Sequence, residues 1–280
     1  MTPELDPTGT TRVFGVVGDP VIHSMSPALH NAAFRSLGVD AVSIALRARE
    51  LDAAVVVDAV RRLGIAGLSV TMPLKAAVVE HCDERTALVE LLGAANCLVR
   101  TADGAGRAES TDGQGLLDAI ACAAHRDVRG LRCAVIGAGG AASAAVVALA
   151  SAGAAEVVVI ARRPDRAGLV ASLVDAGRVG SPSDVSELDI VVQATPAGML
   201  GTSEAQAVPL VDPTSLRAGQ VAVDLVYHPR VTPWLARAAS SGASAVGGVE
   251  VLVHQAAGAL AIWLGVPAPL EALHAAATAP

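Results

Sequence analysis

One lysine is set apart among the residues whose chemistry could support a reaction. The sequence contains nineteen arginines but a single lysine, Lys75. An ammonium group is a compact charge whose pKa shifts readily and which exchanges a proton, unlike a guanidinium. Lys75 lies four residues after Thr71, in the first turn of an expected helix that follows a strand. A cation there opposes the helix dipole, whereas the carboxyl ends of parallel strands bind ligands, so the spacing favours a role at a ligand.

Two hydroxyl side chains precede another expected helix. Ser24 and Ser26 are spaced i, i+2, and Pro27 suits the first turn of a helix that begins there. Hydroxyl donors and free backbone N–H groups at a helix N-terminus together can bind an anion such as a carboxylate. Taken alone, the pattern favours simple capping of the helix by Ser26, with Ser24 incidental.

A glycine-rich turn lies between an expected strand (131–136) and a helix that continues to residue 150. Glycines in such a turn allow a tight bend and close approach of the backbone to a pyrophosphate, and a small residue lets helix and strand pack closely. The strand, turn, helix and strand context predicts dinucleotide binding. The residues expected to contact the cofactor are Gly137, Ala138, Gly139, Gly140 and Ala141.

Arginines follow the second strand of this unit, where the choice between NAD and NADP is made. An NAD site usually presents a carboxylate there for the ribose hydroxyl. Here Arg162, Arg163 and Arg166 can grip a 2′-phosphate bidentately. The pattern favours NADP; Asp165, in the same segment, keeps NAD as the second candidate.

Composition excludes several classes of protein. The chain has 280 residues, 52% hydrophobic and 17% charged, enough to bury two packing units rather than remain disordered. A net charge of −7 and 2% aromatic residues disfavour a nucleic-acid partner. The four cysteines form no CxxC pair, so a reduced compartment and no zinc site are expected. Residues 1–10 show no signal-peptide pattern, and the apolar stretch 141–161 divides at 151–153 into helix, turn and strand rather than a membrane span, so a cytoplasmic protein is expected.

Strands and helices alternate along the chain, which predicts parallel βαβ units. The first half predicts strands at 12–17, 42–46, 66–70 and 96–99, with helices at 26–37, 51–63 and 73–81. The pattern restarts with strands at 131–136, 156–161, 189–194, 220–224 and 244–246. Two apolar helices, 249–264 and 270–277, are expected to return to the first domain. The domains are therefore 1–112 plus 248–280, and 113–247.

Eight stretches in order resemble one family, the shikimate dehydrogenases, including the quinate/shikimate branch. They cover most of the chain and read GDPVIHSMSPALHN (18–31), GLSVTMPLK (67–75), GAAN (93–96), STDGQG (110–115), GAGGA (137–141), ATPAGM (194–199), DLVY (224–227) and GVEVLVHQ (248–255). The resemblance implies a parallel-rich α/β substrate domain and a Rossmann-type NADP-binding domain with a cleft between them. It also implies the NADP-linked, reversible reduction of 3-dehydroshikimate to shikimate.

Roles for individual residues come from the same resemblance. Lys75 and Asp112 are the pair implied at the reacting carbonyl. Thr195 and Gly248 are implied at the cofactor. The substrate would be surrounded by Ser24 and Ser26 at its carboxylate, and by Thr71, Asn96, Tyr227 and Gln255. By themselves, several of these residues also fit plain roles, such as a turn Asn, a helix-capping Asp and a solvent-facing Gln.

The sequence departs from the family pattern at a few positions. Ser69 and Ser110 stand where most members have Asn, Cys97 replaces a usual Thr, and Gln193 a usual Asn. Three alternatives remain at this point: an NAD-linked quinate/shikimate dehydrogenase, an enzyme for an amino analogue, or an inactive member that only binds. The expected partners are the small-molecule substrate and cofactor, with a monomer or homodimer.

Overall fold

The computed structural model describes residues 7–279 and divides into two compact units. The first comprises the chain to Thr111 together with the segment from Gln255, and the second runs from Asp112 to His254. The sequence-based boundaries, after 112 and after 247, thus differ by one residue at the first and seven at the second. Residues 1–6, part of the segment without a signal-peptide pattern, and residue 280 lie outside the described residues.

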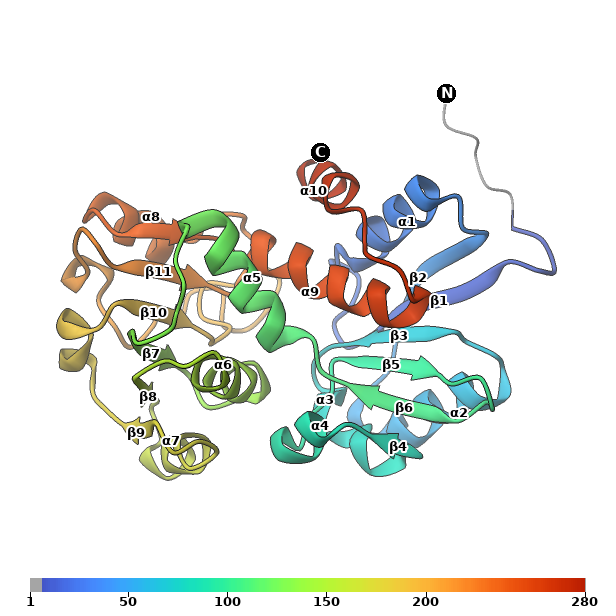
Figure 1. The fold of residues 1–280 in the computed structure, drawn as a ribbon, viewed down its shortest axis with the longest axis horizontal. Helices are drawn as coiled ribbons and strands as arrows, with labels where there is room; N and C mark the ends of the chain where they lie inside the picture. Colours follow the sequence, from blue (N-terminus) through green and yellow to red (C-terminus); the bar gives the residue numbers. More distant parts are fainter. Residues whose placement is uncertain (1–6, 280) are drawn as a thin grey trace. The chain divides into compact units, whose positions relative to one another are not determined.

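The first unit contains a six-stranded sheet with the order β2-β1-β3-β5-β6-β4 (Figure 1). Its strands are β1 (Arg12–Gly18), β2 (Ala41–Arg47), β3 (Gly67–Val70), β4 (Glu84–Arg85), β5 (Cys97–Arg100) and β6 (Gly106–Glu109). Its helices are α1 (Ser26–Leu37), η1 (Glu50–Asp52), α2 (Ala53–Arg62), α3 (Leu74–Ala77), η2 (Val79–His81), α4 (Ala87–Leu92) and α10 (Leu270–Thr278). The expected helix 73–81 is therefore two short pieces, and 51–63 begins with a 3₁₀ turn.

This sheet is rich in parallel pairs, as expected, but two of its strand pairs are antiparallel. Strand β5 runs antiparallel to both β3 and β6. Only residues 101–105 connect β5 to β6, and Gly104 adopts a φ of 92° in that turn. A parallel pair needs a crossover of about a dozen residues, so this short connection dictates a hairpin. The strand β6, with the sequence Gly-Arg-Ala-Glu, lacks the apolar run that would have announced it.

Aromatic residues gather in one part of the first unit. Phe14 of β1 packs on Phe34 of α1 and on Trp263 of α9 (Gly248–Leu264), with ring centroids 5.0 and 5.2 Å apart. His30 meets Trp263 edge-on at 4.9 Å and shares a hydrogen bond of 2.9 Å with the Ser43 hydroxyl. Burial lowers the pKa of His30 to about 3. The indole N–H of Trp263 donates to the carbonyl of Leu98, so the end of α9 packs on this unit's sheet, as expected.

The second unit is a six-stranded parallel sheet with the order β12-β11-β10-β7-β8-β9. Its strands are β7 (Arg132–Ile136), β8 (Glu156–Ile160), β9 (Gly177–Val179), β10 (Ile190–Gln193), β11 (Val221–Asp224) and β12 (Ser244–Val246). Its helices are α5 (Asp112–Ala124), α6 (Gly140–Ser151), α7 (Pro164–Ala171), η3 (Pro182–Glu187), η4 (Pro213–Ser215) and α8 (Pro233–Ser240). This order, with its reversal between β7 and β10, defines a dinucleotide-binding sheet.

Buried residues alternate between the two faces of this sheet. Val135, Val157 and Val159 join a core beneath α5, α6 and α7, while Ala134, Ile136 and Val158 face a second core with Trp234 of α8. The apolar stretch 141–161 is divided between α6 and β8, as predicted. No helix among residues 7–279 is long and apolar enough to cross a membrane.

Candidate active site

The loop that carries the lysine is fixed by backbone hydrogen bonds. Thr71 donates its N–H to the carbonyl of Val17, and Asp19 donates to the carbonyl of Met72, both at 2.9 Å. Lys75 lies in the single turn of α3, and its carbonyl accepts the N–H of Ala95 at 2.8 Å. The loops after β1 and β3 and the residue before Asn96 are therefore held together at one edge of the first sheet.

Asn96 is the centre of a polar cluster in the first unit. Its side chain is buried and accepts the N–H of Thr111 at 2.7 Å. Its amide donates to the hydroxyl of Thr111 at 2.9 Å and to Oε1 of Gln255 at 3.1 Å. Asn96 is thus more than a turn residue, and the half-buried Gln255 accepts a side-chain hydrogen bond as well as meeting solvent. Thr111 is the partner that the sequence did not single out, although it lies within the matching stretch STDGQG.

Ser69 brings a further polar group to the same strand edge. It is 5% exposed, and its hydroxyl has no hydrogen-bond partner among the described residues. It lies opposite Cys97, directly after Asn96, in the antiparallel pair of β3 and β5. A buried, unsatisfied hydroxyl costs free energy, so this group is suited to bind a ligand or a water.

The two serines before α1 are arranged differently from the capping pattern. Met25, not Ser26, occupies the position before the helix, and no side chain caps it. Ser26 is the first helical residue and is 5% exposed, while the Ser24 hydroxyl accepts the Ser26 N–H at 3.3 Å. The expectation that Ser26 caps the helix is therefore wrong. Both hydroxyls lie at the N-terminal end of α1, where anions bind favourably.

The glycine-rich turn follows β7 at the point where the strand order reverses. Gly137 has a φ of 129°, and a Cβ there would lie 3.1 Å from the carbonyl oxygen of Ala194. Gly139 precedes α6 with no atom within 4 Å of the position that a Cβ would take, and Gly140 begins the helix. Ala138 and Ala141 complete the turn. The backbone thus leaves room for a pyrophosphate at a helix N-terminus.

Gln193 fixes the neighbouring loop. The fully buried side-chain amide of Gln193 donates to the carbonyl of Thr195 at 3.0 Å. Its oxygen accepts both the N–H and the hydroxyl of Thr195, at 2.9 and 2.7 Å. Gln193, which departs from the family's usual Asn, therefore holds Thr195 beside the glycine-rich turn.

The arginines expected to select NADP are exposed. Arg162 and Arg163 follow β8, and Arg166 lies in α7. Arg163 forms an ion pair with Asp165 at 2.7 Å, and the hydrogen bond from the Arg163 guanidinium lowers the pKa of Asp165. Because both partners are largely exposed, the pair is weak and open to exchange for a phosphate.

The remaining site residues lie at the start of a helix or just after a strand: Asp112 in α5, Gly248 in α9 and Tyr227 after β11. Asp112 is the first residue of α5 and directly follows Thr111. A Cβ on Gly248 would lie 2.5 Å from the backbone of Val226, so this glycine lets α9 begin close to the segment after β11. Tyr227 is half-buried in that segment. Nearby Asp224 accepts the Val226 N–H at 3.0 Å, and burial raises its pKa to about 6.

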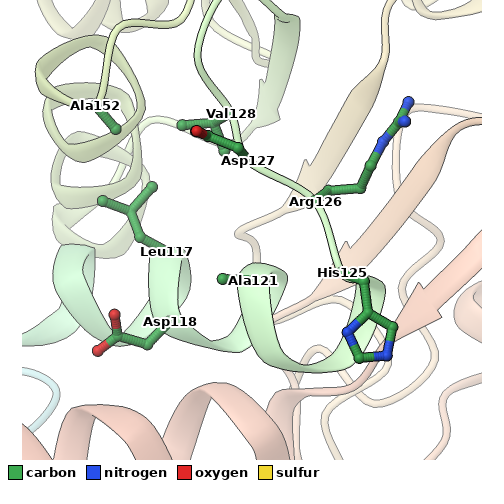
Figure 2. A pocket seen from close by; sticks show the side chains of 8 residues that line it. All are labelled: Leu117, Asp118, Ala121, His125, Arg126, Asp127, Val128 and Ala152. Atoms are coloured by element: carbon green, nitrogen blue, oxygen red, sulfur yellow. The ribbon is translucent and has the colours of Figure 1, made fainter.

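A separate hollow of about 520 Å³ lies in the second unit (Figure 2). It is lined by the end of α5, the segment 125–128 and Ala152. Ala152 follows the C-terminal end of α6, whereas the glycine-rich turn precedes its N-terminal end. A helix of twelve residues is about 18 Å long, so this hollow does not belong to the dinucleotide turn.

The fold and these residues define a class of dehydrogenases that carry a mixed α/β unit and a dinucleotide-binding unit in one chain. Family models match at 16–98 (shikimate dehydrogenase substrate binding domain), 125–207 (NAD(P)-binding) and 248–278 (shikimate 5′-dehydrogenase C-terminal domain). A shikimate dehydrogenase (NADP(+)) of Methanopyrus kandleri is 38% identical over 95% of this chain and 94% of its own. The chain belongs to the shikimate dehydrogenase family.

Solved structures agree with this assignment. Shikimate 5-dehydrogenase from Thermus thermophilus, in complex with NADP(H) and shikimate, has a TM-score of 0.87 at 31% identity, covering 95% of this chain and 98% of that one. A quinate dehydrogenase from Corynebacterium glutamicum, in complex with NAD, has a TM-score of 0.84 at 26% identity, with coverage of 95% and 98%. Both are similar along nearly the whole chain, so the fold alone does not separate the two substrates.

Proposed function

We propose that this protein catalyses the NADP-dependent, reversible reduction of 3-dehydroshikimate to shikimate. The observation that carries the proposal is the hydrogen bond from Asn96 to Gln255, which brings the returning helix α9 to the strand edge near Lys75. Asn96, Gln255 and Thr71 would bind the ring hydroxyls, with Tyr227 beside them. Ser24 and Ser26 would bind the carboxylate, which orients the substrate away from the reacting carbon.

Lys75 and Asp112 are the proposed catalytic pair. During reduction, the Lys75 ammonium donates a proton to the oxygen of the ring carbonyl, and during oxidation the amine accepts it back. Asp112 orients the ammonium and stabilises its charge. The position of Asp112 in the chain supports this role, because Asp112 follows Thr111, which Asn96 holds through two hydrogen bonds. Bound NADPH supplies the hydride for the carbonyl carbon.

In the second unit, the glycine-rich turn suits the pyrophosphate of the cofactor and the arginines suit its 2′-phosphate. Gly137, Gly139 and Gly140 would approach the pyrophosphate, with Ala138, Ala141, Thr195 and Gly248 near the turn. Arg162, Arg163 and Arg166 would bind the 2′-phosphate, after Arg163 exchanges Asp165 for the phosphate. Three guanidiniums near one phosphate favour NADP over NAD.

The experiment is direct. The purified protein is incubated with shikimate and NADP, the reduced nicotinamide is followed by absorbance, and the product is identified by mass spectrometry. We expect equal amounts of NADPH and 3-dehydroshikimate. Reduced cofactor formed with quinate but not with shikimate would instead support a quinate dehydrogenase, the second candidate. Binding of shikimate without any turnover would indicate an inactive family member.

A further inference from the structure

Three potential metal ligands from distant parts of the sequence meet in the second unit. They are Cys122 near the end of α5, and Glu250 and His254 in the first two turns of α9. One ligand atom from each, the thiol sulfur, a carboxylate oxygen and an imidazole nitrogen, lies within 4.8 Å of the other two. This is the one such group of three found among residues 7–279. None of the three has a role in the proposed reaction.

The separation of two of these atoms suits a tetrahedral ion. Oε1 of Glu250 lies 3.3 Å from Nε2 of His254, one helical turn away. With zinc bonds of about 2.0–2.2 Å and tetrahedral angles, two such ligand atoms lie about 3.4 Å apart. With a Zn–S bond of about 2.3 Å, the thiolate needs to be about 3.6 Å from each of them. The Cys122 sulfur already lies within 4.8 Å of both atoms, so it has to approach each by about 1.2 Å at most, and Cys122 is exposed.

Burial and chemistry agree with the geometry. His254 is 8% exposed and therefore held in place, the Glu250 side chain is 23% exposed, and Cys122 is exposed. The site thus has a rigid inner ligand and is accessible to an ion from solvent. Thiolate, imidazole and carboxylate together are a zinc-type donor set, whereas magnesium and calcium prefer oxygen ligands alone.

We propose that Cys122, Glu250 and His254 bind a zinc-class divalent ion, with a water in the fourth position. On binding, the thiol proton of Cys122 passes to the buffer, and the ion joins α5 to the start of α9. The proposal does not depend on the dehydrogenase reaction. This differs from the expectation of no zinc site. That expectation was based on the absence of CxxC pairs, and sequence spacing does not reveal ligands that folding brings together.

The test uses cobalt(II) as a probe, with the whole, metal-free protein, a non-thiol reductant, and neither substrate nor nucleotide. One equivalent of cobalt is expected to bind and to produce a thiolate-to-cobalt charge-transfer absorption, which zinc then abolishes by displacement. Zinc is also expected to raise the melting temperature, since an ion that binds the folded state stabilises it. Because the readouts are spectroscopic and thermal, their failure leaves the proposed enzymatic function untouched.

Variants identify the ligands. Cys122→Ser should remove the charge-transfer absorption, and Glu250→Gln should weaken cobalt binding at least about tenfold, a loss of about 1.4 kcal/mol. His254 is buried and its replacement risks unfolding, so the two more exposed positions carry the test. The control is Glu271→Gln with His274→Gln, an acidic and histidine pair on α10, which should change nothing. No charge-transfer absorption in the wild type, or cobalt affinity unchanged by Cys122→Ser, would overturn the proposal.

Discussion

The side-chain amide of Asn96 donates a hydrogen bond of 3.1 Å to Oε1 of Gln255, a residue 159 positions further along the chain. This contact joins the strand edge of the first unit to a helix that arrives only after the whole second unit has been completed. Gln255, the residue at which the chain returns to the first unit, is therefore part of the polar cluster around Asn96.

Gln255→Ala should raise the KM for shikimate about tenfold and leave the KM for NADP unchanged. The variant would remove the proposed hydrogen bond to the substrate and would leave the buried Asn96 amide short of one partner, at about 1 kcal/mol each. The measurement is steady-state kinetics combined with thermal unfolding. Gln114→Ala, on an exposed position of α5, is the control and should change neither constant. A shikimate KM equal to that of this control would place Gln255 outside the substrate site.

Lys75→Ala and Lys75→Arg should each lower kcat at least about 100-fold, because general acid–base catalysis contributes a factor of about 10²–10⁴. Arginine keeps the charge but holds its proton too tightly and has a different shape. Binding of shikimate, measured by calorimetry, should be largely retained. If Lys75→Arg stayed within about tenfold of wild-type turnover, the proton-transfer role would be wrong.

Replacing Arg162, Arg163 and Arg166 by Gln should raise the KM for NADP much more than the KM for NAD. Only NADP has the 2′-phosphate that the guanidiniums would bind. A triple variant of exposed arginines elsewhere in the unit, at positions 126, 129 and 237, keeps the same net charge as the test variant. Equal losses with both cofactors would mean that the arginine cluster only supports the fold.

Ser24→Ala combined with Ser26→Ala should weaken substrate binding, because two hydrogen bonds to a carboxylate are lost, each worth about 1.5–3 kcal/mol. Since Ser26 does not cap α1 with its side chain, the melting temperature should fall only slightly. Ser36→Ala, at an exposed position of the same helix, is the control. A large fall in melting temperature with an unchanged KM would show that these serines are structural.

The stability of the first unit should fall in acid because of His30. Below pH 6.5 the unfolded chain protonates this histidine, while in the folded unit it stays neutral down to about pH 3. The free energy of unfolding should therefore fall by about 1.4 kcal/mol per pH unit across this window. Asp224 in the second unit acts in the opposite sense, since its folded pKa is raised to about 6.

Fluorescence of Trp263 can isolate the first unit, if Trp234 of the second unit is replaced by Phe. In this background, His30→Gln should flatten the dependence of unfolding on pH between 6.5 and 3, whereas His81→Gln, at an exposed position, should not. An unchanged slope in the His30 variant would contradict the assignment of the acid sensitivity to this residue.

The sequence predicted five of the six strands of the second unit, because most of them are short, buried, β-branched runs; the partly buried β9 was missed. Val157 to Ile160, for example, form a strand with both faces covered, as a parallel sheet requires. The first sheet was harder to predict. The β5–β6 hairpin depends on a glycine turn and on β6, a strand of little apolar character, and the outer strand β4 is only two residues long.

Side-chain hydrogen bonds that form only in the folded chain explain what the sequence could not predict. The sequence does not show that Asn96 bonds to Thr111, or that Gln193 bonds to Thr195 rather than to water. Isolated polar residues form no periodic pattern from which such a contact could be predicted. The roles of the site residues came from the family resemblance, which proved correct for the family. No matching stretch includes Cys122 together with Glu250 and His254, so only the folded chain revealed this cluster.

The most direct test of the central claim is kcat/KM for shikimate and quinate, each measured with NADP and with NAD. Differences in kcat/KM report how well the enzyme stabilises each transition state. We predict that shikimate with NADP exceeds each of the other three combinations by at least about tenfold, or 1.4 kcal/mol. The largest kcat/KM for quinate with NAD, or no turnover in any combination, would contradict the account.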